Sequence, residues 1–204
     1  MTLDTVEKWV RRAGGIGVLV FVLAMYLGLA RAAHHPLGRR SGQAPGFVRG
    51  SWAFYIPASL VGYGLLARIW RPLPLKLPQT ARAAALIVGA PLYFLGLALM
   101  LWGRFTLGEM YNVSTTMGAQ LYADHRLVTA GPFRLMRHPM YLGGMLAEVG
   151  AFLLYRTWGT LFILINTPLL PIRARREEEA LAAEFGEQWT EYARRVPMLL
   201  PRIG

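Results

Sequence analysis

The sequence predicts an all-α integral membrane protein with five transmembrane helices, three spans plus a helical hairpin, and a cytoplasmic C-terminal amphipathic helix. Of its 204 residues, 54% are hydrophobic and only 16% are charged, whereas soluble domains carry about 25% charged residues. Apolar stretches of about 20 residues, long enough to cross about 30 Å of hydrocarbon, recur along the chain. The net charge of +11 comes mainly from arginines between those stretches. This pattern is typical of basic loops at a membrane and not of a nucleic-acid-binding patch.

The apolar stretches define the predicted elements in order. Three of them, at residues 14–33, 52–70 and 83–104, are each long enough for one span. A fourth apolar region, residues 141–172, is too long for one span and is interrupted at residues 155–159 by an arginine between aromatic side chains. A charged residue flanked by aromatics is typical of the membrane interface. We therefore expect a tight helical hairpin there, which brings the count to five spans.

The loop charges predict the orientation of these spans. Five spans place loops 31–51 and 104–140 and the C-terminal tail on one face of the membrane. That face carries 14 Lys and Arg residues against 8 on the other. Because cytoplasmic loops carry an excess of Lys and Arg, the C-terminus and the loop 104–140 are expected in the cytoplasm. The cations near the N-terminus, Lys8, Arg11 and Arg12, are an exception to this rule.

The last thirty or so residues differ in composition from the spans. Residues 173–187 are rich in charged residues and in good helix formers, and Leu181 and Phe185 are spaced i, i+4. This spacing predicts an amphipathic helix that continues from the fifth span. The prolines at 197 and 201 are expected to end regular structure.

The loop before the hairpin holds the first group of candidate site residues. Gly131-Pro132 predicts a turn, and Pro139 suits the first position of the following helix. The free N–H groups of that helix start, beside Arg137 and His138, make an anion site. Tyr141, one turn later, offers an aromatic face to a cation. Alternatively, Arg137 and His138 only anchor the helix at lipid headgroups.

Two further candidate groups lie in the second half of the chain. Arg173 and Glu177 are four residues apart and share a helix face, from which Glu178 is turned away by about 140°. Alternatively, Arg173 and Glu177 form an ordinary surface ion pair. Glu148 lies about two turns inside the fourth span, where an ionisable group indicates function. Asn166 in the same hairpin is its expected hydrogen-bond partner. The alternative is a protonated, purely structural Glu148.

The order and spacing of these residues resemble the isoprenylcysteine carboxyl methyltransferase family of integral-membrane methyltransferases and its phospholipid methyltransferase relatives. The matching elements are Leu127-Val128-Thr129-x-Gly131-Pro132, Arg137-His138-Pro139-x-Tyr141-x-Gly143, Glu177-Glu178-x-x-Leu181-x-x-x-Phe185-Gly186, Tyr192 and Val196-Pro197. The resemblance covers residues 125–204 and is generic before them. It implies one transmembrane domain, residues 1–204, with three N-terminal spans in 1–104 and a cofactor-binding catalytic part in 105–204.

The resemblance also implies S-adenosylmethionine as the cofactor and a lipophilic or prenylated acceptor that arrives from the bilayer. The implied catalytic residues are Arg173, which would grip the acceptor, and Glu177. The cofactor contacts implied by position are His125, Arg126, Leu127, Val128, His138, Pro139, Met140, Tyr141 and Glu177. Arg173, Glu148 and Asn166 are the expected acceptor-binding residues, with no metal involved; the chain contains no cysteine. Phe133 stands where the family often has tyrosine, and Gln120 is a further candidate contact.

Two other functions fit parts of the sequence. Membrane sterol and enone reductases have a related C-terminal architecture and bind NADPH, and the arginine-rich loop would suit the 2′-phosphate. A membrane scaffold without enzymatic activity would bind no cofactor and would leave Glu148 and the short hairpin unexplained. The motif around Arg137 and the two adjacent glutamates favours the methyltransferase.

Overall fold

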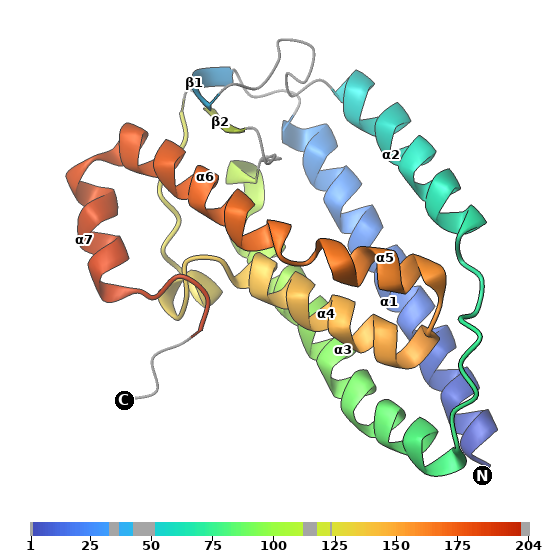
Figure 1. Ribbon diagram of the computed structural model, residues 1–204. Coiled ribbons are helices and arrows are strands. Elements are labelled where there is room, and N and C mark those ends of the chain that lie inside the picture. Colours follow the sequence, from blue (N-terminus) through green and yellow to red (C-terminus); the bar gives the residue numbers. More distant parts are fainter. Residues whose placement is uncertain (1, 33–36, 43–51, 112–117, 123, 201–204) are drawn as a thin grey trace.

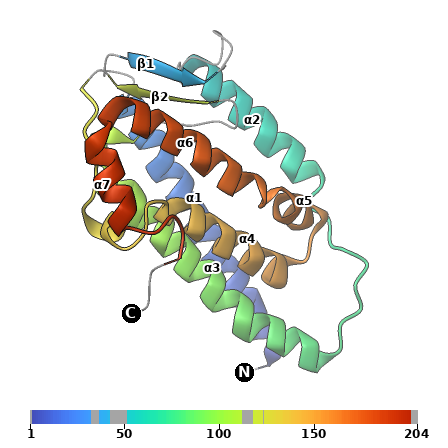
Figure 2. The same ribbon diagram turned by 60° about the vertical axis from the view of Figure 1, so that its left-hand side comes forward.

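The computed structural model describes residues 2–32, 37–42, 52–111, 118–122 and 124–200. It is built mainly of helices that lie side by side (Figures 1 and 2). In chain order they are α1 (Leu3–Ala32), α2 (Trp52–Arg68), α3 (Gln79–Leu107), η2 (Gly108–Met110), η3 (Gly131–Arg134), α4 (Pro139–Tyr155), α5 (Trp158–Asn166), α6 (Leu169–Phe185) and α7 (Glu187–Arg195). Two short strands, β1 (Leu37–Gly42) and β2 (Gly118–Tyr122), pair antiparallel. The all-α prediction did not include this small ladder between two loops that are distant in sequence.

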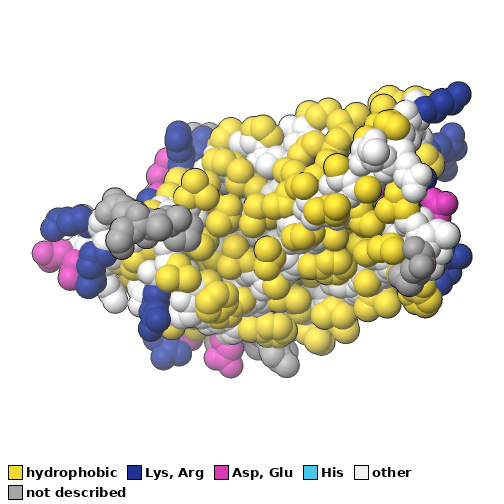
Figure 3. Space-filling model, turned by 90° about the horizontal axis from the view of Figure 1, so that it is seen from below, with side chains coloured by type: hydrophobic (Ala, Val, Ile, Leu, Met, Phe, Trp, Pro, Cys, Tyr) yellow, Lys and Arg dark blue, Asp and Glu magenta, His cyan; other side chains and the backbone are white. Residues whose placement is uncertain are grey.

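The first three predicted apolar stretches coincide largely with observed helices. The stretches 14–33, 52–70 and 83–104 lie within or close to α1, α2 and α3. Among the residues that the structure describes, two helical stretches, Leu3–Gly28 and Gln79–Met110, are long and apolar enough to cross a membrane, and Pro139–Tyr155 is apolar but shorter. Figure 3 shows one face of the molecule covered with hydrophobic side chains between charged groups at its two ends.

Helices α3 and α4 form the most closely packed pair, along a seam of glycines. A Cβ atom at Gly96 would lie 2.5 Å from both the Ala147 nitrogen and the Gly143 oxygen. A Cβ at Gly150 would lie 2.7 Å from the Gly89 oxygen. Since backbone atoms cannot move aside as side chains do, only glycine permits this approach. Residues of the two helices, including Leu97, Ala147 and Leu154, form the buried core beside the seam.

The chain reverses between α4 and α5 at the residues where the sequence predicts the interruption. Arg156 adopts the left-handed conformation with φ of 51° and ends α4. Thr157 then caps α5: its side chain accepts a hydrogen bond from the Thr160 backbone N–H, and the Thr160 side chain accepts one from the Thr157 N–H. The predicted turn is therefore confirmed at these residues.

The predicted continuous helix from the fifth span into the tail is interrupted after Asn166. Thr167 donates its N–H to the Leu164 oxygen, and Leu170 donates to the Thr167 oxygen, so the ladder tightens to i, i+3 bonds. Pro168 has no N–H to continue the α-helical pattern. α6 then covers most of the predicted helix 173–187, and Gly186, with φ of 51°, turns the chain into α7.

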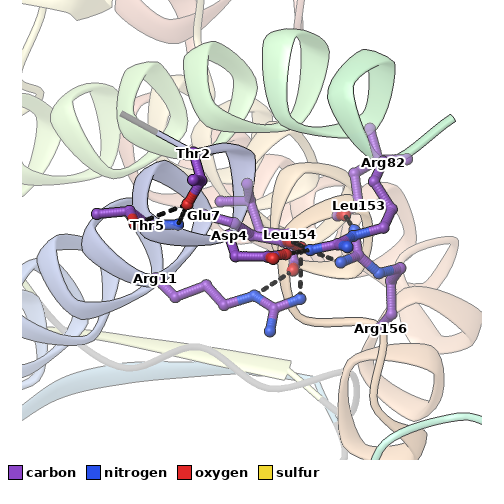
Figure 4. A network of polar contacts seen from close by, with 9 residues as sticks. All are labelled: Thr2, Asp4, Thr5, Glu7, Arg11, Arg82, Leu153, Leu154 and Arg156. Atoms are coloured by element: carbon purple, nitrogen blue, oxygen red, sulfur yellow. Dashed lines mark hydrogen bonds and ion pairs between the residues drawn. The ribbon is translucent and has the colours of Figure 1, made fainter. Parts of the chain in front are cut away.

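Helix α1 begins at Leu3, well before the predicted start of its span at residue 14. Its first turns are held by Glu7, which is only 5% exposed. Arg11 donates Nη2 to Glu7 Oε1 at 2.7 Å, and Arg82 of α3 donates Nη2 to Glu7 Oε2 at 2.6 Å (Figure 4). Arg156 also donates to Glu7 Oε1. One buried carboxylate therefore ties α1 to α3 and to the α4–α5 turn, which local hydropathy could not predict.

Candidate functional site

A cavity of about 350 Å³ lies where α3, α4 and α6 meet the loop before α4. This volume is within the range of small-molecule sites, roughly 300–1,000 Å³. It is lined by apolar, aromatic and ionisable side chains: Met25, Met100, Leu107, Met110, Tyr111, His125, Leu127, Val128, Phe133, Arg137, His138, Pro139, Met140, Tyr141, Gly144, Glu148, Leu170, Arg173, Glu177, Leu181, Trp189 and Tyr192. The predicted loop, hairpin start and C-terminal helices thus converge on one hollow.

The loop is shaped by its turn residues and held by the C-terminal chain. Gly131 has φ of 56° and begins η3, and Pro139 is the first residue of α4, as predicted. The backbone N–H groups of Arg137 and His138 donate to the carbonyl oxygens of Pro197 and Met198, at 2.9 and 3.0 Å. This pairing presents the first turn of α4 to the cavity.

Glu178 fastens this loop to α6 and, through Arg137, to the end of α7. Its Oε1 atom lies 2.8 Å from Arg137 Nε and 2.9 Å from His138 Nε2. Arg137 also donates Nη1 to the carbonyl oxygens of Ala193 and Val196, both at 2.8 Å. His138 is only 5% exposed. The alternative that Arg137 and His138 merely anchor the helix at lipid headgroups is therefore wrong, because both side chains are held inside the protein.

This arrangement lowers the pKa of Glu178. Burial alone would raise the pKa, but the hydrogen bonds and positive charges of His138 and Arg137 outweigh it. A carboxyl group with a lowered pKa in the folded state stabilises the fold above its unfolded value of 4.5. That stabilisation is lost as the pH falls through the lower pKa of the folded state.

We expect Glu178→Gln to lower the free energy of unfolding by about 1–3 kcal/mol at neutral pH, because it weakens hydrogen bonds to two largely buried cationic or polar groups. The variant should also lose part of the fall in stability that the wild type shows below pH 4.5. Melting curves in detergent at several pH values measure both effects. Glu179→Gln, at the exposed neighbouring position, is the control. Identical pH profiles for wild type and Glu178→Gln would contradict the assignment.

Tyr141, Arg173 and Glu177 form the second polar group of the cavity. The Tyr141 hydroxyl donates to Glu177 Oε2 at 3.0 Å. The Arg173 guanidinium carbon lies 5.8 Å from the centre of the Tyr141 ring, within the range of a cation–π contact. Arg173 and Glu177 both border the cavity, which agrees with their predicted common helix face. The Tyr141 ring therefore contacts a cation, but this cation is the side chain of Arg173 and not a ligand.

Glu148 lines the same cavity, but the prediction that Asn166 is its hydrogen-bond partner is wrong. The amide of Asn166 is exposed and donates to the Phe162 carbonyl oxygen at 2.7 Å. Glu148 Oε2 instead accepts a hydrogen bond from the Thr167 hydroxyl at 2.5 Å. The tight turn after α5 places residue 167, and not 166, toward α4.

The other predicted contacts are divided between cavity and surface. His125, Leu127, Val128, Pro139 and Met140 line the cavity. Burial lowers the pKa of His125, partly offset by nearby carboxylates. Arg126 does not line it; its backbone N–H lies 3.3 Å from the Met110 sulfur. The side chain of Gln120 is outside the described part of the structure.

Several cavity residues were not predicted as contacts. Trp189 and Tyr192 lie on α7 and pack with Val196 against Leu181 and Phe185. The Tyr192 hydroxyl donates to the Phe133 carbonyl oxygen at 2.7 Å, and burial raises the pKa of Tyr192 to about 12. Trp189 and Tyr192 are three residues apart on an otherwise polar helix, and this spacing was the sequence signal that could have identified them. Met25, Met100 and Tyr111 belong to segments without a motif.

Comparison with known proteins supports the predicted family. Residues 88–183 match the isoprenylcysteine carboxyl methyltransferase family. Methanethiol S-methyltransferase of Pseudomonas deceptionensis is 31% identical over 74% of this chain and 59% of its own length. Methanethiol S-methyltransferase 2 of Bradyrhizobium diazoefficiens is 28% identical over 92% of this chain and 75% of its own length. Protein-S-isoprenylcysteine O-methyltransferase of Rattus norvegicus is 30% identical over 53% of this chain and 40% of its own length. These matches bear out the resemblance predicted from the sequence, and all three of these relatives are methyltransferases by name.

Proposed function

Because residues 88–183 match the isoprenylcysteine carboxyl methyltransferase family, we propose that this protein is an integral-membrane methyltransferase with S-adenosylmethionine as its methyl donor. Its acceptor is a small lipophilic molecule, of the isoprenylcysteine or the thiol type. The observation that carries the proposal is the cavity, in which Tyr141, Arg173 and Glu177 meet the first turn of α4.

The residues of the cavity fit the chemical groups of S-adenosylmethionine. The start of α4, at Pro139 and Met140, borders the cavity, and a helix N-terminus suits a carboxylate. Glu177 is an acceptor for ribose hydroxyls or for the amino group. Trp189 and Phe133 add aromatic surface for a base. The sulfonium is a cation, which suits the aromatic face of Tyr141 and the carboxyl oxygens of Glu148.

The residues of this chain would mainly position the reactants. The bound donor supplies an activated methyl group, so the protein has to align the acceptor with it and keep water away. Arg173 is placed to hold a negatively charged acceptor, either a carboxylate or the charge that develops on a sulfur. Met100, Met140 and Leu170 exclude water from the same space. In this proposal residues 105–204 supply most of the cofactor site.

We place five spans across the membrane, with the cavity and the C-terminus on the cytoplasmic side. In support, the α2–α3 linker and the α4–α5 turn lie together: Leu73 donates its N–H to the Arg156 oxygen at 2.8 Å, and Trp158 donates to the Arg71 oxygen at 3.0 Å. The Glu7 contacts bring the start of α1 to the same end (Figure 4). The lipophilic acceptor would reach the cavity from the bilayer, while the cofactor would arrive from the cytoplasm.

Ligand binding to the detergent-purified protein tests the proposal. We expect calorimetry to detect S-adenosylmethionine and S-adenosylhomocysteine but not NADPH. Tyr141→Ala should weaken both adenosyl ligands about tenfold or more, because it removes the ring and the hydroxyl contact to Glu177. Phe162→Ala, at an exposed aromatic of α5, is the control. Binding of NADPH alone would favour the reductase, and binding of none by a folded protein would favour the scaffold.

Glu148 supports an acceptor that gives up a proton. Its carboxyl group borders the cavity, where in its ionised form it would repel a carboxylate acceptor and could take the proton of a thiol, phenol or amine. When a thiol accepts the methyl group, a carbon–sulfur bond forms to the acceptor and the bond from that carbon to the sulfonium breaks. The thiol proton would pass to Glu148 and then to water.

We expect Glu148→Gln to lower turnover with a small thiol by about 10²–10⁴-fold, which is the usual contribution of a positioned base. The affinity for S-adenosylhomocysteine should change little, because the amide keeps the shape of the side chain. Methylation of methanethiol and of a farnesylcysteine analogue, each followed against pH, measures the effect. Asn166→Ala is the control, since Asn166 is exposed. Undiminished thiol methylation by Glu148→Gln would exclude this role.

A further inference from the structure

A second cluster of charged residues lies at the end of the molecule where α1 begins. We call it the Glu7 cluster; it consists of Asp4, Glu7, Arg11, Arg82 and Arg156 (Figure 4). Arg11 also donates Nε to the Leu154 carbonyl oxygen at 2.8 Å, and Arg156 donates Nη1 to the Leu153 oxygen at 2.7 Å. Arg82 directs the same atom, Nη2, to both Asp4 and Glu7. The cluster is therefore a hydrogen-bonded unit that connects α1, α3 and the end of α4.

An open cavity of about 440 Å³ adjoins this cluster. Four of its six lining residues are cations and two are carboxylates: Lys8, Arg11, Arg12 and Arg82, with Asp4 and Glu7. Both carboxylates already accept hydrogen bonds from Arg82, and Glu7 accepts further ones from Arg11 and Arg156. Positive charge is thus in excess, and the ammonium of Lys8 and the guanidinium of Arg12 contribute donors beyond those used by the cluster.

The cavity lies at the level expected for lipid headgroups. Trp9, beside it in sequence, is 58% exposed, and the Arg12 guanidinium carbon lies 5.3 Å from the centre of the Trp9 ring. Exposed tryptophan is typical of the membrane interface. Between Ile16 and Leu27 the exposed side chains of α1 are large and apolar, as at Leu19 and Leu23. The cations therefore lie one or two turns beyond a lipid-facing helix surface.

We propose that this cavity binds the phosphate of an anionic membrane phospholipid. Lys8 and Arg12 contact the phosphate oxygens, Arg11 and Arg82 supply the remaining positive field, and the acyl chains run along the apolar surface of α1. This assignment also accounts for the cations that depart from the positive-inside rule at the N-terminus, since part of their charge is neutralised by the cluster and the rest by lipid. It is independent of the proposed methyl transfer.

Lipid titration of the full-length, delipidated protein in detergent tests the proposal. Native mass spectrometry would count bound phosphatidylglycerol, phosphatidylcholine and inorganic phosphate at equal phosphate concentrations. We expect phosphatidylglycerol to bind preferentially. The double substitution Lys8→Gln with Arg12→Gln should weaken it about 30-fold, since each cation near an anionic lipid contributes roughly a fivefold factor. The ion pairs of Glu7 in the described part of the structure are with Arg11, Arg82 and Arg156 and not with these two residues, so the melting temperature without lipid should change little.

The matched control is the double substitution Arg175→Gln with Arg176→Gln, which removes the same charge from exposed positions of α6. It should leave the affinity for phosphatidylglycerol within about twofold of the wild type, because charges beyond a Debye length of about 10 Å are screened. Equal losses in the two double variants would overturn the proposal. So would equal binding of phosphatidylcholine, or binding of inorganic phosphate as tight as that of the lipid, which would indicate a site for the free anion.

Discussion

Replacing Arg173 by alanine is expected to lower kcat/KM about 10²–10³-fold, the usual cost of removing one charged or hydrogen-bonding group that stabilises a transition state. Arg173 borders the cavity and its guanidinium lies over the Tyr141 ring. The neighbouring Arg137 cannot replace it, because its guanidinium is already bound to Glu178 and to two carbonyl oxygens. Steady-state kinetics with a thiol and with a farnesylcysteine analogue measure the loss.

Calorimetry separates this effect from cofactor binding. The affinity for S-adenosylhomocysteine should change only a few-fold in Arg173→Ala, since the substitution leaves the Tyr141–Glu177 hydrogen bond in place. Arg173→Lys should recover only part of the activity, because an ammonium lacks the planar fork of the guanidinium. Arg176→Ala, at an exposed position of the same helix, should behave as wild type. Full turnover by Arg173→Ala would remove this residue from the reaction.

Substitution of Gly150 by alanine is expected to destabilise the fold by about 3 kcal/mol or more, at or above the upper end of the cost of overpacking a core. The added Cβ would meet the nitrogen and Cα of Tyr93 and the oxygen of Gly89, all of them backbone atoms of α3. Helices α3 and α4 would have to separate along their whole contact. Melting curves of the purified protein in detergent measure the effect.

Gly144 provides the matched control on the same helix. A Cβ there would lie 3.6 Å from Leu170 Cδ1, which is an ordinary van der Waals contact. Gly144→Ala should therefore melt at or above the wild-type temperature, because alanine favours a helix by about 1 kcal/mol over glycine. If Gly150→Ala and Gly144→Ala melt alike, the close approach of α3 and α4 is not what stabilises this pair.

Features determined by local sequence were predicted correctly. The lengths of the apolar stretches placed α1, α2 and α3, and Arg156 between aromatic residues placed the turn before α5. The loop from Gly131 to Pro139 carries its own turn signals and folds as expected. The start of α1 was missed because it depends on Arg82 and Arg156, which are distant in sequence.

The sequence predicted which residues lie at the site better than it predicted which of them contact one another. Helical spacing showed that Glu177 and Glu178 point in different directions, but it could not show that Glu178 faces Arg137 and His138. The same limit explains the exchange of Asn166 for Thr167: a tight turn of two residues changed the helical phase. Local periodicity gives direction around one helix, whereas pairing depends on how two helices are set against each other.

The glycine seam between α3 and α4 has a consequence for how ligands exchange. Glycines recur every seven residues in α3, at 89, 96 and 103, and in α4, at 143 and 150, and at Gly96, Gly143 and Gly150 backbone atoms of the two helices lie directly against each other. We therefore expect the backbones of these two helices to keep their relative position when ligands exchange. The opposite wall of the cavity is formed by α6, and breaks in the helical structure lie at both of its ends, at Thr167-Pro168 and at Gly186. In the proposed reaction, we expect release of the spent cofactor to require α6 and α7 to move away from α4, which would break the Glu178 contacts to Arg137 and His138.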